Sequence, residues 1–124
     1  MNVVDSSGWL EYFADAANAE AFAPAVEDAD QLAVPALVIF EVGRRIRQQR
    51  GEELASEAMA VLERLRVVPL DAELAIAAVR LGDEHRLAMA DSIIYATAQS
   101  LGATLWTQDA DFAGLPGVSY FAKT

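Results

Sequence analysis

The opening sequence MNVVDSSGWLEYF, residues 1–13, passes from a short apolar run to large apolar side chains at helical spacing. The run Met1 to Val4 predicts a first buried strand that ends at Asp5. Ser6–Ser7 follows, and a serine hydroxyl can cap a helix by accepting a hydrogen bond from its first turn. The strand is therefore expected to lead directly into a helix, and the same alternation recurs along the chain.

The rest of the chain repeats short apolar runs separated by amphipathic stretches. Further strands are expected at Gln31–Val34, Arg66–Pro69, Thr104–Thr107 and Val118–Phe121. Further helices are expected at Asn18–Glu27, Pro35–Gln49, Glu52–Leu65, Ala72–Glu84 and Ala90–Gly102, with Asp71 as a cap. This pattern predicts a three-layer α/β fold, a central parallel sheet flanked by helices, in a single domain over residues 1–124. Ligands of such sheets bind beyond the carboxyl ends of the strands.

Composition excludes several classes of site and of protein. The chain has 124 residues, 54% of them hydrophobic, with no cysteine and one histidine. A disulfide scaffold, a thiolate zinc site, a cysteine nucleophile and a multi-histidine metal site are therefore excluded. The longest uncharged stretch, Ser92 to Gln108, is interrupted by polar residues and glycine, so no membrane span is expected. Residues 1–10 lack the basic start of a secretory signal, and a soluble, cytoplasmic protein is predicted.

The formal net charge is −10, and residues 1–30 contain acidic residues but no basic one. Broad, salt-driven binding to nucleic acid needs clustered Lys and Arg, so this balance argues against it. A nuclease is still possible, because its metal site requires carboxylates and its contact with the backbone can be local.

Four acidic residues stand where this fold would place a site. Asp5 follows the first predicted strand and Asp109 follows the fourth, so both are expected at the carboxyl edge of the sheet. Asp91 lies within the apolar face of a predicted helix, and Glu41 lies within an apolar stretch at 37–42. Local explanations exist for the last two: a helix-dipole role for Asp91, and an ion pair of Glu41 with the arginines that follow it.

Together, four carboxylates at one sheet edge would repel one another unless they were protonated or bridged by a cation. Carboxylate oxygens and water are the ligands that Mg²⁺ or Mn²⁺ prefers. A bound divalent cation can activate water and neutralise charge that develops on a phosphate. The pattern therefore predicts a metal site formed by Asp5, Glu41, Asp91 and Asp109.

An ordered set of motifs resembles the PIN-domain nucleases, and among them the small VapC-type toxins of toxin–antitoxin pairs. The matching pieces are VVDSS at 3–7, Pro35 with Glu41, MADSIIYA at 89–96, WTQDADF at 106–112 and LPGV at 115–118. They span nearly the whole chain. The resemblance implies Mg²⁺-dependent endonucleolytic cleavage of RNA, with a 3′-hydroxyl and a 5′-phosphate as products. It also implies a homodimer and inhibition by a cognate antitoxin.

The same resemblance implies that Asp5 and Asp91 bind the metal, with Glu41 and Asp109 acting directly or through coordinated water. Ser6 and Thr107 match hydroxyl positions that support the acids, although each could equally be a cap or turn residue. Asp111 matches a frequent second acid of the last motif, or caps the residues after it.

Other conspicuous residues have competing interpretations. Arg44, Arg45, Arg47 and Arg50 either contact an RNA backbone or form a solvated face paired with Glu52, Glu53 and Glu57. The helical spacing of Trp9, Tyr12 and Phe13 favours a place in the core over stacking on bases. His85 is expected to be solvated, in a loop or at a helix end.

Two rival functions are a phosphoacceptor receiver-like signalling domain and a non-catalytic PIN-like interaction module. A receiver needs adjacent acids after its first strand, an aspartate after its third and a lysine near the end of its fifth. Here Asp5 stands alone, and the only lysine is Lys123. All four acids are present, so nothing in the sequence indicates a non-catalytic site.

Overall fold

The computed structural model describes residues 1–124 and contains a five-stranded sheet in the order β3-β2-β1-β4-β5. The strands are β1 (Asn2–Val4), β2 (Leu32–Pro35), β3 (Arg66–Val68), β4 (Thr104–Thr107) and β5 (Val118–Tyr120). Every strand pairing is parallel, as predicted. The strand order reverses direction on either side of the central β1, so the end of β1 lies at the topological switch point where such sheets bind ligands.

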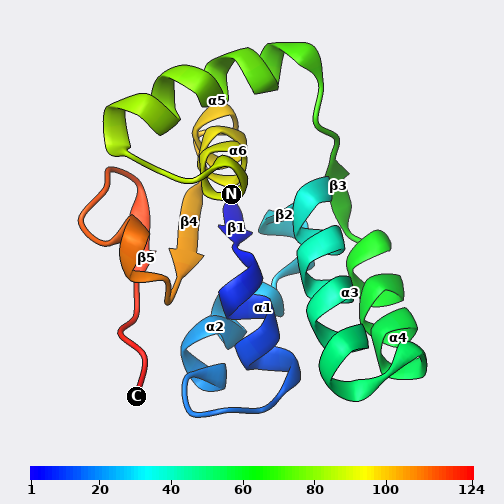
Figure 1. The fold of residues 1–124 in the computed structure, drawn as a ribbon. Helices are drawn as coiled ribbons and strands as arrows, with labels where there is room; N and C mark the ends of the chain where they lie inside the picture. Colours follow the sequence, from blue (N-terminus) through cyan, green and yellow to red (C-terminus); the bar gives the residue numbers. More distant parts are fainter.

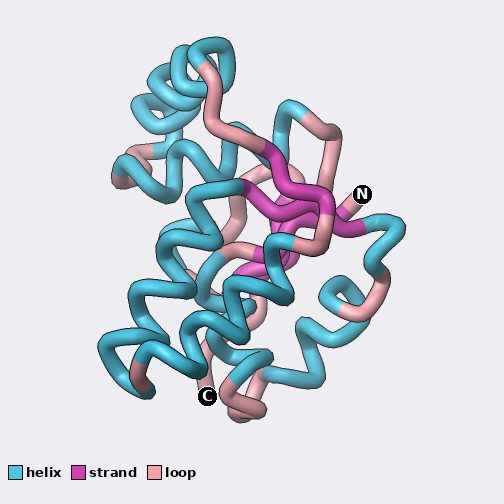
Figure 2. Tube along the Cα trace, turned by 90° about the vertical axis from the view of Figure 1, so that its right-hand side faces the viewer, coloured by secondary structure: helices cyan, strands magenta, loops and turns pink.

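Helices flank the sheet on both sides and complete a three-layer α/β fold (Figures 1 and 2). They are α1 (Ser6–Phe13), α2 (Ala19–Val26), α3 (Ala36–Arg50), α4 (Glu52–Glu63), α5 (Ala72–His85) and α6 (Met89–Ser100), with 3-10 turns η1 (Ala29–Gln31) and η2 (Ala110–Phe112). Helices α3 and α4 form a hairpin at Gly51, whose φ of 96° suits glycine. No helix is both long and apolar enough to cross a membrane.

The helix caps partly differ from the sequence prediction. Asp71 caps α5 by accepting from the Leu74 N–H at 2.8 Å, as expected. The cap of α1, however, is Asp5 and not Ser6 or Ser7, since the Asp5 carboxylate accepts from the Gly8 N–H at 3.2 Å. The reason is that Asp5 has extended backbone at the end of β1, the conformation an N-cap requires, whereas Ser6 is already helical.

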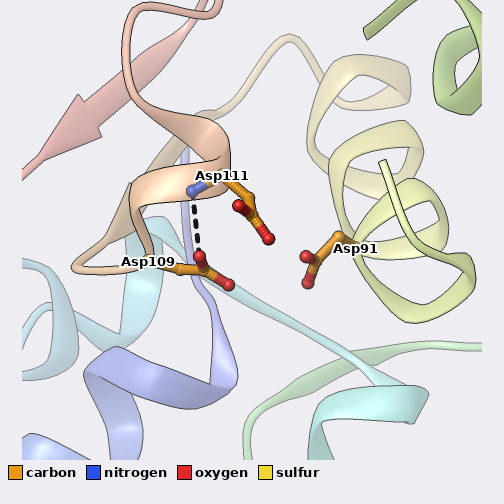
Figure 3. Close-up of side chains that lie close together, drawn as sticks. All are labelled: Asp91, Asp109 and Asp111. Carbon is orange, nitrogen blue, oxygen red and sulfur yellow. Dashed lines mark hydrogen bonds between the residues drawn. The ribbon is translucent and has the colours of Figure 1, made fainter. Parts of the chain in front are cut away.

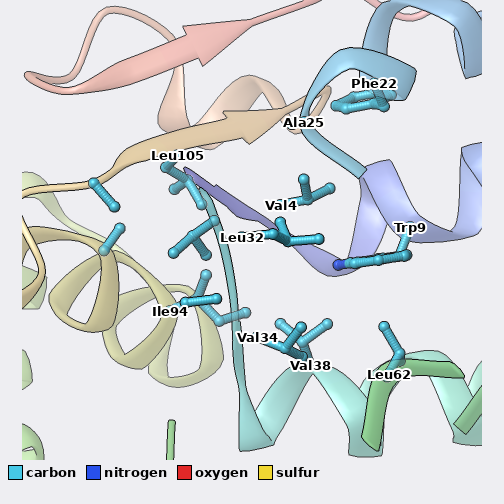
Figure 4. Close-up of a cluster of buried hydrophobic side chains, with 14 of the residues drawn as sticks. Val4, Trp9, Phe22, Ala25, Leu32, Val34, Val38, Leu62, Ile94 and Leu105 are labelled. Carbon is cyan, nitrogen blue, oxygen red and sulfur yellow. The ribbon is translucent and has the colours of Figure 1, made fainter. Parts of the chain in front are cut away.

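The core fills the space between the sheet and the helices (Figure 4). Val4, Leu32 and Leu105 from the strands are essentially inaccessible, and Trp9 and Phe22 from the helices pack with them. Trp9 therefore belongs to the core, as its spacing predicted. Gly8 allows this close approach, because a Cβ there would lie 2.6 Å from Val4 Cγ1 and 2.8 Å from Phe22 Cε1. The start of α1, and with it Asp5, is thus held firmly against the core.

Candidate active site

The four predicted acids line one hollow of about 340 Å³ at the carboxyl edge of the sheet. Asp5 comes from the end of β1, Glu41 from α3, Asp91 from the first turn of α6 and Asp109 from the connection between β4 and η2. Residues far apart in the sequence meet there because parallel strands end at the same edge.

Asp5 is the most enclosed of these acids, with 3% of its surface exposed. Its carboxylate accepts hydrogen bonds from Ser7 Oγ at 2.7 Å, Thr107 Oγ1 at 2.9 Å and the Gly8 N–H at 3.2 Å. Burial nevertheless raises the pKa of Asp5 to about 6, although these donors act in the opposite direction. Thr107 therefore supports an acid, the role that the family resemblance implied for it.

Asp91 is partly exposed and accepts no hydrogen bond from the rest of the chain. Burial, followed by the nearby charges of Asp109, Asp5, Glu41 and Asp111 in that order of importance, raises its pKa to about 7. The helix dipole alone does not explain the position of Asp91. The first turn of α6 favours the ionised carboxylate, whereas burial and the neighbouring carboxylates oppose its ionisation.

Glu41 accepts a hydrogen bond from Ser6 Oγ. It forms no ion pair with an arginine, so the ion-pair explanation of its position is wrong. The single contact of the chain between a basic and an acidic side chain joins His85 Nε2 to Glu84 Oε1 at 4.0 Å, and it is an ion pair only when His85 is protonated. The pairing of the α3 arginines with glutamates of α4 is therefore wrong too, and these guanidinium groups remain free. The side chain of His85 is only 17% exposed and packs edge-on against Tyr95, so it is less solvated than predicted.

Asp109 and Asp111 complete the acidic cluster from the other side of the hollow. Carboxylate oxygens of Asp91, Asp109 and Asp111 lie within 4.8 Å of one another, and Figure 3 shows the three side chains converging. Asp109 Oδ1 accepts from the Asp111 N–H at 2.9 Å and caps η2. The expectation that Asp111 is the cap is therefore wrong, and its carboxylate is free to face Asp91.

Sequence reasoning did not single out Ser7 and Gln108 as supports of the site. Ser7 Oγ accepts from the Gln108 N–H at 3.3 Å while it donates to Asp5. The buried Gln108 side chain donates to Glu11 Oε1 at 3.0 Å and accepts from Asn18 Nδ2 at 3.0 Å. The connection that carries Asp109 is thereby tied to α1 and to the start of α2. No local pattern marks Gln108, because its partners Ser7, Glu11 and Asn18 lie about a hundred positions away. Ser7, in contrast, is only two positions from Asp5.

A second, more apolar hollow of about 620 Å³ lies between α1 and the α3–α4 hairpin. It shares Ser7, Leu10 and Arg45 with the acidic hollow, so the two adjoin. Leu54 and Val61 of α4 lie on its wall and are 41% and 44% exposed.

The donor set of the acidic hollow fits a hard divalent cation. It consists of carboxylate oxygens, and no lysine or arginine pairs with any of them. Oxygen ligands of this kind suit Mg²⁺ or Mn²⁺ and do not suit metals that require sulfur or imidazole.

Residues 3–118 match the sequence model of the PIN domain family. Fold, acidic hollow and sequence match agree, and the chain belongs to the PIN domain family. This membership argues against the receiver-like alternative. Among curated proteins, none matches the sequence.

Solved structures resemble the chain over nearly its full length. A chain of a toxin–antitoxin complex from Klebsiella pneumoniae is 26% identical, with 96% of each chain covered and a TM-score of 0.77. VapC20 of Mycobacterium tuberculosis, a sarcin–ricin loop-cleaving toxin, is 21% identical, with 95% of this chain and 97% of that chain covered and a TM-score of 0.76. A chain of DNA-bound VapBC from Salmonella typhimurium is 15% identical, with 98% of each chain covered and a TM-score of 0.74. The last two establish likeness of fold.

Proposed function

We propose that this chain, acting as a single PIN domain, is a metal-dependent endoribonuclease and the toxin of a toxin–antitoxin pair. The observation that carries the proposal is the meeting of Asp5, Glu41, Asp91 and Asp109 in one hollow without a cationic side chain paired to them. The likeness to VapC20, a sarcin–ricin loop-cleaving toxin, supports RNA as the substrate. An activity on cellular RNA also agrees with a cytoplasmic location.

Asp5 and Asp91 are the proposed ligands of Mg²⁺ or Mn²⁺, with Glu41 and Asp109 acting directly or through coordinated water. A bound cation supplies an activated water and neutralises the charge that develops on the phosphate. Ser7 and Thr107 orient the Asp5 carboxylate through their hydrogen bonds. The free guanidinium groups of Arg44 and Arg45 border the hollow and can contact phosphates of the RNA backbone.

The test is cleavage of end-labelled RNA by the purified chain with Mg²⁺ and with EDTA. Asp5→Asn preserves the shape of the side chain but removes the charge that holds the cation, so cleavage should fall by orders of magnitude. Asp28→Asn is the matched control, because Asp28 is exposed and its side chain caps nothing. Full cleavage in EDTA would falsify the metal dependence, whereas no cleavage by the wild type with Mg²⁺ or Mn²⁺ would favour a non-catalytic PIN-like module.

The proposed antitoxin occupies the larger hollow and extends an arginine into the acidic one. The likeness to chains of toxin–antitoxin complexes supports such a partner, and the adjacent position of the two hollows supports the route. A guanidinium forms bidentate bonds to carboxylates and so would compete with the metal. Val61→Glu should therefore weaken inhibition by a cognate antitoxin without changing cleavage, and inhibition should weaken as Mg²⁺ rises.

The proposed homodimer uses the outer face of α5, which lies across α6 at the outside of the molecule (Figure 1). Ile76 and Val79 on this face are 73% and 68% exposed, one turn apart. Apolar side chains this exposed are typical of surfaces that a partner covers. Sedimentation should show a dimer for the wild type and a monomer of 13.3 kDa for Ile76→Asp. A wild-type monomer at micromolar concentration would contradict this assignment.

A further inference from the structure

Phe40 is an exposed aromatic residue at the edge of the acidic hollow. It precedes Glu41 on α3 and lines the hollow together with the four acids. Its side chain is 57% exposed and is not part of the core cluster, whereas Trp9, Tyr95, Phe22 and Phe112 are fully buried. The packing of the chain therefore provides no reason for a large aromatic ring at this position.

A free cation lies beside this ring. The guanidinium carbon of Arg44, one helical turn further along α3, is 5.9 Å from the centroid of the Phe40 ring. Arg44 has no acidic partner, and it borders the same hollow. An aromatic face and an unpaired guanidinium thus stand together at the mouth of a cluster of carboxylates.

This pairing has the chemistry that binds one nucleotide of a single strand. Every nucleobase can stack on an aromatic side chain, and guanidinium groups contact phosphates. The acids that would act on a phosphate repel the RNA backbone, so attraction has to come from groups at the rim of the hollow. Phe40 and Arg44 are placed to supply it.

We propose that Phe40 is the stacking platform for the nucleobase next to the scissile phosphate, and that Arg44 contacts the phosphate of that nucleotide. This inference rests on the proposed function and deepens it, because it names the residue that positions the RNA strand. It makes Phe40 a residue that contacts substrate without taking part in the bond cleavage.

The test is a double-mutant cycle, in which the Phe40 side chain and one RNA base are removed separately and then together. Binding of a short single-stranded RNA is measured by fluorescence anisotropy in the Asp91→Asn background, with the intact RNA and with versions lacking one base on either side of the cleavage position. Phe40→Ala should weaken binding of the intact RNA by about 5-fold to 150-fold, the range for loss of one stacked base. One of the abasic RNAs should bind the protein that retains Phe40 as weakly as the intact RNA binds Phe40→Ala. Removing both the ring and that base should weaken binding no further than removing either one.

Two further variants separate stacking from general packing. Phe40→Trp keeps an aromatic face and should restore binding, whereas Phe40→Leu keeps only apolar surface and should not. Met89→Ala is the control, since Met89 is 78% exposed but does not line the hollow. It should leave RNA binding unchanged.

The outcomes distinguish this inference from the proposed function. If the chain cleaves RNA with Mg²⁺, and Phe40→Ala binds RNA with the affinity of the protein that retains Phe40, only the role of Phe40 is overturned. Losses that add for every abasic position also overturn it. A Phe40→Ala variant that binds RNA normally but changes its sedimentation would assign the ring to a protein interface. RNA that is neither bound nor cleaved overturns the proposed function itself.

Discussion

Asp5 and Asp91 face the same hollow but are held in opposite ways. Asp5, at the end of β1, is buried and receives hydrogen bonds from Ser7, Gly8 and Thr107. Asp91, on the first turn of α6, receives none, and burial together with four other carboxylates raises its pKa. The strand end is built to position a carboxylate. The helix start instead presents a charge that nothing in the chain balances.

This difference indicates where a cation has the largest effect. Donors around Asp5 already favour its charged form, and they also fix the direction of its oxygens. At Asp91 the charged form is opposed by burial and by repulsion, and only a group from outside the chain can offset both. The two acids are therefore expected to respond differently to substitution, to pH and to metal.

The largest expected effect concerns metal binding at the helix side. Asp91→Asn removes a proposed ligand, so Mn²⁺ affinity measured by calorimetry should fall by at least about 100-fold, above the range that outer-shell partners cost. Asp28→Asn should bind Mn²⁺ like the wild type. Equal Mn²⁺ affinity in wild type and Asp91→Asn would remove Asp91 from the metal site.

The second effect is a loss of stability with rising pH in EDTA. The raised pKa values of Asp5, about 6, and Asp91, about 7, mean that the folded chain holds protons that the unfolded chain releases. Stability is then fully present below pH 4 and is lost as pH rises through 6 and 7. For the buried Asp5 alone the loss is about 3 kcal/mol, since its pKa lies about two units above the unfolded value.

Urea unfolding at several pH values between 4 and 8 measures this loss. Asp91→Ala should abolish the loss between about pH 6 and 7, to which Asp91 alone contributes, and reduce the loss below pH 6 to the part due to Asp5. A stability that rises across this range would show that both carboxylates are better solvated than the structure indicates.

The third effect tests the support of the strand side. Gln108→Met keeps the bulk of the side chain but loses its hydrogen bonds to Glu11 and Asn18. Asp109 should then be less well positioned, and Mn²⁺ affinity should fall by about tenfold, as for other outer partners of metal ligands. Tyr12→Phe is the control, because it removes an α1–α2 hydrogen bond to Glu27 without touching the site. If Gln108→Met only lowered the melting temperature, Gln108 would be purely structural.

The smallest expected effect is on the free energy of unfolding in EDTA at pH 5, when alanine replaces either Asp5 or Asp91. Asp5→Ala removes the cap of α1 and should lower the free energy of unfolding by about 1 kcal/mol. Asp91→Ala removes no hydrogen bond and should leave stability unchanged or raise it slightly, because alanine favours the helix. Chemical denaturation measures the free energy of unfolding of both variants. A larger loss of stability in Asp91→Ala than in Asp5→Ala would show that Asp91, and not Asp5, is the acid with a structural role.

The sequence by itself determined the strands, the helices and the sites where acids would meet. Asp5 and Asp109 followed apolar runs, and Asp91 interrupted a helical face. These signals are local, because strand and helix periodicities and the ends of elements are encoded in neighbouring residues. Parallel strands then bring such ends to one edge without further information.

Only the tertiary structure decided which groups surround the acids. The bonds of Gln108 to Glu11 and Asn18, the exposure of Phe40 and the absence of ion pairs on α3 all depend on how distant elements pack. The caps differed for the same kind of reason: Asp5 and Asp109 took them because their backbones turn out extended at the strand ends. Periodicity places a residue on a face, but the partners of its side chain are set by contacts between segments far apart in the sequence.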